Sequence, residues 1–147
     1  MSQLTLTVVA YADKMSEIQF LRSQVYILEQ GIDSTGVFDG QDETAEQILA
    51  YLDNQPVGTA RVRYLDNQIA SIEKLAVLSN ARRQGIGKKI MEKALELAAQ
   101  KNIKEVVIRA QEYVKGLYQQ LGFEQEGESF KVVGNPHALI NMRKRLG

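Results

Sequence analysis

The chain has 147 residues, with 18 basic and 18 acidic side chains, one histidine and no cysteine. This length is enough for one domain with a sizeable core, and the balanced charge gives no indication of a nucleic-acid partner. The absence of cysteine excludes disulfides, cysteine-based zinc sites and a cysteine nucleophile, and a single histidine disfavours a histidine-rich metal site.

No apolar run approaches 18 residues, so no membrane-spanning helix is expected. The first residues, Met1-Ser2-Gln3-Leu4, lack the basic and apolar regions of a signal peptide. We therefore expect a cytoplasmic protein with no membrane partner.

The first half of the chain is predicted to hold a strand, a helix and a meander of three strands. Residues 4–10 are rich in β-formers, and an apolar stripe at steps of three and four predicts a helix that Asp13 caps and Gly31 ends. A polar, acidic loop is expected at residues 32–43. The next strands are predicted at residues 45–52, 57–65 and 69–78, with turns at residues 53–56 and 66–68. Because short turns join these three strands, they should pair antiparallel.

The second half is predicted to alternate strands and helices. A helix runs from Gly85 to about residue 101, and a short helix ends at Gly122. The predicted elements are completed by strands at residues 105–110, 123–126 and 138–142, with the short helix at residues 114–121. A strand, a helix and another strand should form one parallel crossover. Without repeats or linkers, residues 1–147 are expected to form one α/β (α+β) domain, whose mixed, mostly antiparallel central sheet is flanked by helices.

A glycine-containing loop before the long helix is the most informative segment: Arg82-Arg83-Gln84-Gly85-Ile86-Gly87-Lys88. Free N–H groups and the helix dipole at a helix N-terminus favour an anion. The spacing fits neither a Walker loop, which needs Ser or Thr after the lysine, nor a dinucleotide fingerprint, which needs a third glycine where Ile90 stands. A diphosphate-bearing cofactor is therefore predicted, with a purely structural glycine turn as the alternative.

Two motifs resemble those of a known family. The loop fits the pattern [Q/R]-x-x-G-x-[G/A] from Arg82 to Gly87, and a later segment fits Y-x-x-x-G-F from Tyr118 to Phe123. Both resemble signatures of the GNAT superfamily of N-acetyltransferases, which bind acetyl-coenzyme A, and the order of elements resembles that fold over essentially the whole chain. Other features resemble the ElaA/YjcF-like branch, although Gln47 stands where that branch usually carries a histidine. They are Val25-Tyr26, Glu29-Gln30-Gly31, Asp39 with Asp42, Arg61-x-Arg63, Ile72-Glu73-Lys74-Leu75, Ala110-Gln111 and Pro136-His137.

The resemblance implies a cofactor site between two strands that diverge, one ending at Val77 and the other at Ala110. The gap would receive the pantetheine arm, which can pair with strand backbone as an added strand does. The cofactor-binding residues so implied are Leu75, Ala76, Val77, Arg82, Arg83, Gln84, Gly85, Ile86, Gly87, Lys88, Gln111 and Tyr118. For Leu75 and Val77 the alternative role is core packing. For Gln111 the alternative is a structural place in a turn. Simple strand alternation would put Glu73 on the same face as Leu75 and Val77.

Transfer to an amine needs a base, because an aliphatic ammonium with a pKa of about 10.4 is almost fully protonated near pH 7. Glu73 is the leading candidate. Its alternative role is an ion pair with Arg61 or Arg63 across the hairpin. Glu29, at the end of the first helix, is the second candidate, with a place on the surface as its alternative.

Tyr118 is the candidate acid for the departing thiolate. A phenol has a pKa of about 10 and a thiol about 8.5, so a hydrogen bond to the thiolate, rather than full proton transfer, would help. Packing under the last helix is its alternative role. His137, the only histidine, is a candidate for the acceptor pocket or for proton transfer, with a bystander in a loop as the alternative.

The expected function is transfer of an acetyl group from acetyl-coenzyme A directly to a primary amine on a small molecule or peptide, since no cysteine is present to carry the acyl group. A catalytically silent acyl-coenzyme A sensor is the alternative. The acidic residues 33–46 would favour a cationic acceptor if the loop is not simply solvated, whereas Arg61 and Arg63 would favour an anionic one, so the acceptor stays open. Exposed strand edges are compatible with a homodimer.

Overall fold

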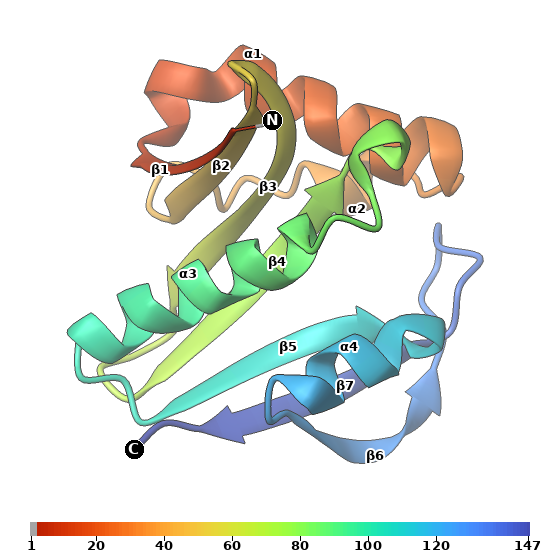
Figure 1. Cartoon of the computed structure of the whole chain (residues 1–147). Coiled ribbons are helices and arrows are strands. Elements are labelled where there is room, and N and C mark those ends of the chain that lie inside the picture. The colour runs from red at the N-terminus through yellow and green to blue at the C-terminus, as the bar shows by residue number, and fades with distance from the viewer. Residues whose placement is uncertain (1–2) are drawn as a thin grey trace.

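Seven strands form one sheet, in the order β1-β2-β3-β4-β5-β7-β6, in the structure, a computed structural model that describes residues 3–147 (Figure 1). The strands are β1 (Leu4–Val9), β2 (Glu46–Leu52), β3 (Gln55–Tyr64), β4 (Ile69–Val77), β5 (Glu105–Gln111), β6 (Glu124–Phe130) and β7 (Leu139–Arg145). The helices are α1 (Tyr11–Arg22), the π-helix η1 (Ser23–Glu29), α2 (Ser34–Val37), the 3₁₀ turns η2 (Ser79–Ala81) and η3 (Glu112–Val114), α3 (Ile86–Gln100) and α4 (Lys115–Gln120).

All neighbouring strands pair antiparallel except β4 and β5, which pair parallel. The antiparallel meander β2-β3-β4 and the single parallel crossover through α3 are therefore confirmed. Short turns force antiparallel pairing of β2, β3 and β4, whereas the long helical connection returns the chain to the same end of the sheet before β5.

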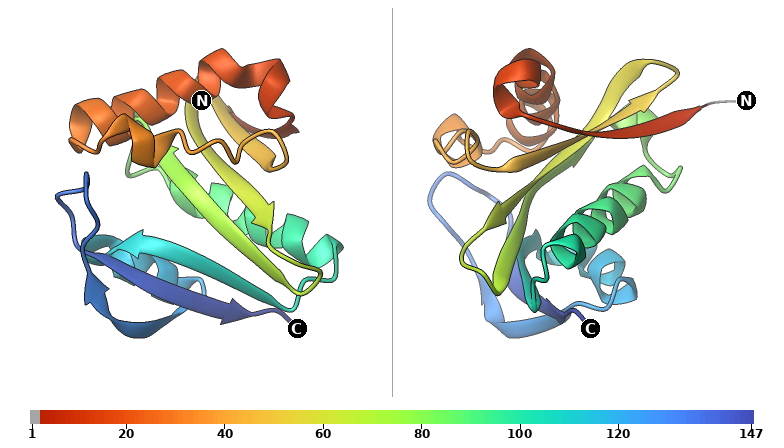
Figure 2. Two further views of the ribbon diagram at one scale, coloured as in Figure 1. Left: turned by 180° about the vertical axis from the view of Figure 1, so that it is seen from behind. Right: turned by 90° about the vertical axis from the view of Figure 1, so that its left-hand side faces the viewer.

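Helices cover both faces of the sheet: α3 and α4 lie on one face, and α1 and α2 lie on the other (Figure 2). The apolar stripe of α3, including Ile90 and Ala94, is fully buried in the larger core. Gly58 on β3 allows the close approach, because a Cβ atom there would lie 2.8 Å from Cδ1 of Ile90. A smaller core under α1 contains Ile18 and Leu21. Among residues 3–147 no helix is long and apolar enough to cross a bilayer.

Two local predictions in the first half are wrong. Helix α1 begins at Tyr11 after Ala10, and Asp13 lies inside the first turn instead of capping it. Lys14 has non-helical dihedral angles, so the helix is kinked before the apolar stripe begins at Ile18. The predicted loop at residues 32–43 contains the short helix α2, which Asp33 caps by accepting the Thr35 N–H at 2.9 Å. One turn of helix is too short to produce an apolar stripe, so the sequence pattern did not reveal it.

Candidate active site

A cleft opens where β4 and β5 stop pairing. The two strands are joined at only three positions, from Ile69 opposite Glu105 to Ser71 opposite Val107, and then spread apart (Figure 1). The cleft has a volume of about 1110 Å³ and is lined by both separated strand ends, the loop before α3, residues of α4 and residues 132–135. The predicted gap between diverging strands is therefore present, and within residues 3–147 no strand pairs with the backbone edge of β4 there.

A β-bulge in β4 shapes one wall of the cleft. The register between β3 and β4 shifts by one residue, and Lys74 has a φ angle of 57°. The extra residue reverses the alternation that would otherwise continue along the strand. Glu73 and Lys74 therefore both face away from α3, and Lys74 donates from Nζ to the Gly36 carbonyl of α2 at 2.6 Å.

The bulge also overturns the predicted alternation of β4. Leu75 and Val77 pack against the same core cluster as Ile72, whereas Glu73 accepts a hydrogen bond from Ser71 at 2.7 Å on the opposite face. Glu73 therefore does not share a face with Leu75 and Val77. No motif in the sequence marks a bulge at a lysine, which is a residue that rarely adopts a positive φ angle.

The predicted anion loop lies at the N-terminus of α3. Gly85 caps the helix in the left-handed region with a φ angle of 75°, and Arg83 also has a positive φ angle. The backbone N–H groups of residues 84–88 donate to no backbone acceptor within residues 3–147. Because the loop lines the cleft, these free donors and the helix dipole favour an anion at this point.

Arg82 connects this loop to Glu29, at the end of η1. Its guanidinium donates to both carboxylate oxygens of Glu29, one at 2.6 Å, and its Nε donates to the Val77 carbonyl at 3.0 Å. The hydrogen bonds from Arg82 lower the pKa of Glu29. Glu29 is thus the ion-pair partner of a loop residue and not a free carboxylate.

Tyr118 lies on α4 and lines the cleft. Its ring packs edge-on against Phe123, with centroids 6.2 Å apart. Burial, with a smaller contribution from Tyr113, raises the pKa of Tyr118 to about 12. The side chain is both packed in the core and open to the cleft, so the two predicted roles of this tyrosine are compatible.

Glu73 is held by two arginines and a serine. Its Oε1 accepts from Nε and Nη2 of Arg61, at 2.8 and 2.6 Å, and its Oε2 accepts from Arg63 at 3.1 Å and from Ser71. Burial alone would raise the pKa of Glu73, but the hydrogen bonds from Ser71 and Arg61 outweigh it and lower that pKa overall. The ion pair across the hairpin that the sequence offered as the alternative for Glu73 is therefore present.

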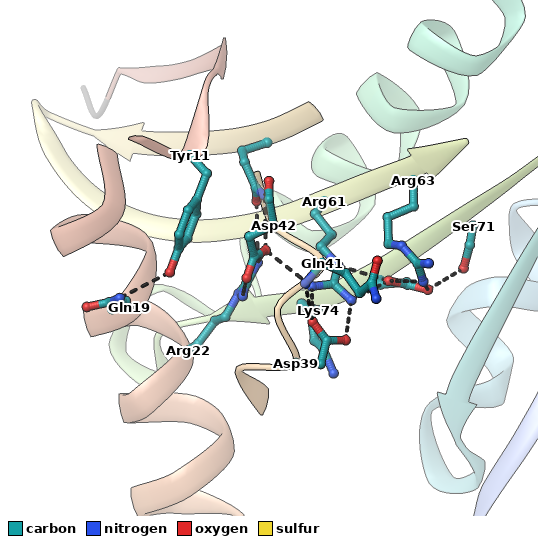
Figure 3. A network of polar contacts seen from close by, with 12 residues as sticks. Tyr11, Gln19, Arg22, Asp39, Gln41, Asp42, Arg61, Arg63, Ser71 and Lys74 are labelled. Atoms are coloured by element: carbon teal, nitrogen blue, oxygen red, sulfur yellow. Dashed lines mark hydrogen bonds and ion pairs between the residues drawn. The ribbon is translucent and has the colours of Figure 1, made fainter. Parts of the chain in front are cut away.

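A buried network of charges continues from Arg61 into the molecule (Figure 3). Arg61, 1% exposed, donates to Asp39 at 2.6 Å and to Asp42 at 3.2 Å. Asp42 in turn accepts two hydrogen bonds from the fully buried Arg22, at 2.7 and 2.9 Å, and one from Gln47. Asp39 and Asp42 are thus not simply solvated, and Arg61 is too buried to steer an acceptor. Gln47, at the position where the branch usually has a histidine, belongs to this network.

Residues of the far end of the cleft meet around Gln30. Gln111 donates from Nε2 to Oε1 of Gln30 at 2.6 Å, and both glutamines line the cleft. His137 contacts the Gln30 carbonyl through Nε2 at 3.2 Å, but it is not among the cleft-lining residues. Tyr26, which sequence reasoning noted only as part of the branch pattern, lines the cleft and donates from its hydroxyl to the Leu75 carbonyl.

Comparison with known proteins agrees with this architecture. Residues 33–146 match the family model of the acetyltransferase (GNAT) domain. The chain is 26% identical over 126 residues to the Bacillus subtilis protein named Uncharacterized N-acetyltransferase YjcF, covering 85% of this chain and 89% of YjcF. The crystal structure of Escherichia coli ElaA matches with a TM-score of 0.85 and 23% identity, covering 97% of this chain and 99% of ElaA. That of an acyl-CoA N-acyltransferase from Pseudomonas aeruginosa matches with a TM-score of 0.83 and 26% identity, over 97% and 99% of the two chains.

The matched range holds most of the features that form the cleft. It includes the separated ends of β4 and β5, the loop before α3, and Tyr118. The motifs, the fold and these relatives agree with one another. The chain belongs to the GNAT acetyltransferase family, and its similarity to YjcF and ElaA supports the ElaA/YjcF-like branch.

Proposed function

We propose that this protein transfers an acetyl group from acetyl-coenzyme A to a primary amine. The observation that carries the proposal is the cleft between β4 and β5, into which both the free N–H groups before α3 and Tyr118 open. The match to a Pseudomonas aeruginosa protein described as an acyl-CoA N-acyltransferase supports the choice of cosubstrate. A sensor without catalysis would need the same cofactor loop but would not need Tyr118.

The cofactor has a distinct place for each of its parts in this proposal. The diphosphate would bind the N–H groups of residues 84–88, where Arg83 and Lys88 also line the cleft. The pantetheine arm would lie along residues 75–77, whose backbone edge pairs with no strand of the described residues 3–147 on the side of β5. Gln111 would meet the cofactor or the acceptor at the far wall.

In the reaction, the neutral amine attacks the thioester carbon, so that a C–N bond forms and the C–S bond breaks. The ammonium gives one proton to water before the attack, the nitrogen loses a second as the amide forms, and the coenzyme A thiolate takes up one. With its pKa raised to about 12, Tyr118 holds its proton more tightly than a thiol with a pKa of about 8.5. Its role is therefore to donate a hydrogen bond to the developing thiolate.

We propose that Glu73 attracts the ammonium and does not remove its proton directly. A carboxylate whose pKa is lowered is a weak base toward an ammonium with a pKa of about 10.4. We propose that Glu73 orients the acceptor and that the proton leaves through water. Glu29 already pairs with Arg82, so we propose that it holds that arginine. His137 contacts the Gln30 carbonyl, so we propose that it holds Gln30.

The pH dependence of the reaction is expected to follow the amine. Glu73 is already ionised at neutral pH, so kcat/KM should rise about tenfold per pH unit between about pH 6 and pH 9 as the acceptor loses its proton. Initial rates at saturating acetyl-coenzyme A would measure this. An inflection between these limits that disappears in His137→Gln, or in Glu73→Gln, would instead assign a direct base to that residue.

The proposal is tested by calorimetric titration of acetyl-coenzyme A, coenzyme A, ATP and NAD, followed by thiol release with a library of amines. Binding confined to the coenzyme A species, together with release in the presence of an amine, is the expected result. Binding without release for any amine would favour the sensor. Absence of binding would return the glycine loop to a structural role.

Replacing Tyr118 by phenylalanine is expected to lower kcat about 100-fold, the loss typical when one donor to a developing anion is removed. The affinity for acetyl-coenzyme A should change little, because the hydroxyl acts only as the thiolate forms. Tyr64→Phe is the matched control, since the Tyr64 hydroxyl donates to Glu46 and does not line the cleft. Equal effects of the two substitutions on kcat would remove Tyr118 from the mechanism.

A further inference from the structure

The wall of the cleft formed by β5 presents a cation on the face away from α3. Along this strand Val106, Ile108 and Ala110 are buried in the core, so strand alternation turns Arg109 to the opposite face. Arg109 is exposed and lines the cleft. The β-bulge turns Glu73 and Lys74 to the same face from β4. Both walls of the cleft therefore contribute charged side chains on the face of the sheet that α2 covers, opposite α3.

Most of the carboxylates on this face are already neutralised. Glu73 pairs with Arg61 and Arg63, as described above. Asp39 pairs with Arg61 at 2.6 Å, and Glu126 pairs with Arg143 at 2.9 Å. Asp33 is exposed at the rim and accepts the Thr35 N–H and hydroxyl at the start of α2.

In contrast to these carboxylates, the two cations Arg109 and Lys74 form no ion pair within residues 3–147. Arg109 lies over the ring of Phe130, with 5.1 Å between its Cζ and the ring centroid, and no carboxylate within residues 3–147 forms an ion pair with it. The ammonium of Lys74 donates to a carbonyl and likewise has no carboxylate within 4.0 Å in that part of the chain. The N–H groups of the Arg109 guanidinium thus have no carboxylate partner in that part of the chain, and these are the groups that bind a carboxylate.

We propose that the acceptor is an amine that also carries a carboxylate, such as an amino acid, and that Arg109 binds this carboxylate. The proposal rests on the proposed acetyl transfer and narrows its acceptor. The ammonium would approach Glu73 on β4, and the carboxylate would meet Arg109 on β5, with Lys74 adding positive charge on the same face. A polyamine would bring a second ammonium, in place of the carboxylate, toward Arg109 and Lys74, and these two cations would repel it.

The test compares amino acids with their carboxamides as acceptors for the whole protein, by thiol release at saturating acetyl-coenzyme A. Amidation of the carboxylate lowers the pKa of the amine, so more of a carboxamide is unprotonated at a given pH. Each rate is therefore divided by the concentration of the unprotonated amine. The wild type should prefer the acids. Arg109→Gln should lower kcat/KM for the acids about 10- to 100-fold, as expected for loss of a charged hydrogen-bonding group, and leave that for the carboxamides unchanged. Arg145→Gln, at the exposed end of β7 and outside the cleft, is the control and should change neither.

The outcomes separate this proposal from the one on which it rests. Carboxamides that react as well as the acids, or an Arg109→Gln variant that lowers both series equally, would overturn the carboxylate acceptor while acetyl transfer stands. Failure of coenzyme A to bind would overturn acetyl transfer and the acceptor class with it. Binding of coenzyme A without thiol release for the acids would overturn the acceptor class alone, and the amine library then decides whether acetyl transfer stands. Unchanged affinity of Arg109→Gln for coenzyme A, measured by calorimetry, shows that the variant is folded.

Discussion

Replacing Gly87 by aspartate is expected to weaken binding of acetyl-coenzyme A about 1000-fold while leaving the protein folded. Gly87 is in the first turn of α3, where the diphosphate is proposed to bind. A carboxylate about 4 Å from one phosphate charge costs about 4 kcal/mol at an effective dielectric constant of 20, and each 1.4 kcal/mol is a factor of ten in affinity. Calorimetric titration of the variant and the wild type would measure the difference.

The stability of this variant should move in the opposite direction. A Cβ atom at Gly87 would lie 3.8 Å from Cγ2 of Val77, an ordinary contact, and Gly87 is not among the glycines with positive φ angles. An aspartate in the first turn of a helix is favourable by about 0.3–1 kcal/mol, so the melting temperature should be equal or higher. Gly85 is less suitable for this test, because its φ angle of 75° would strain any side chain.

Gly87→Asn is the control that separates charge from size. The amide has nearly the same shape as the carboxylate but no charge, so its effect on affinity reports steric crowding alone. Equal losses for the two variants would mean that crowding, and not charge repulsion, weakens binding, so that no phosphate charge lies close to Gly87. A loss below tenfold in Gly87→Asp would place the cofactor elsewhere.

Features that depend on neighbouring residues were predictable from the sequence. The alternating and helical patterns placed most of the strands and α3, and the spacing of Gly85 and Gly87 marked the start of that helix. The glycine and tyrosine motifs were enough to indicate the family. Strand lengths at the C-terminus were less predictable, because β6 extends to Phe130 only by pairing with β7.

Some features that depend on distant residues were not predictable. The bulge at Lys74 has no local signal, yet it decides which face Glu73 occupies. The same holds for Arg22, whose partner Asp42 is 20 residues away. The sequence shows an arginine in a helix and an aspartate in a polar stretch, and both patterns are typical of solvent-exposed residues. Only the folded chain brings them together and buries them.

Replacing Asp42 by asparagine is expected to reduce the free energy of unfolding by about 3–5 kcal/mol, the range for removing one partner of a buried ion pair. Arg22 has no solvent exposure, and its Nε already lacks a hydrogen-bond partner within residues 3–147. The asparagine amide would leave the Arg22 charge uncompensated and would turn a donor toward the donors of Arg22 or Arg61. Since domains of this size are stable by only about 5–15 kcal/mol, the substitution removes a large share. Urea unfolding followed by circular dichroism would measure it.

The pH dependence identifies the charge of Asp42 as the cause. Burial alone would raise the pKa of Asp42, but the hydrogen bonds and charge of Arg22 outweigh it, so the pKa is lowered on folding. A group of this kind stabilises the fold above its unfolded pKa of about 3.9 and loses that contribution as the pH falls through its folded pKa. The difference between wild type and Asp42→Asn should therefore be constant from about pH 7 to pH 5 and shrink in more acidic solution.

Glu96→Gln is the surface control. Glu96 pairs with Lys93 at 3.6 Å on α3, and its side chain is 55% exposed. Such pairs contribute about 0.2–1 kcal/mol, because water screens the charges and the side chains lose entropy. If Asp42→Asn costs no more than Glu96→Gln, and the cost does not vary with pH, then the Arg22–Asp42 pair gives no net stability. The acidic segment would then be fixed by its packing and not by its charges.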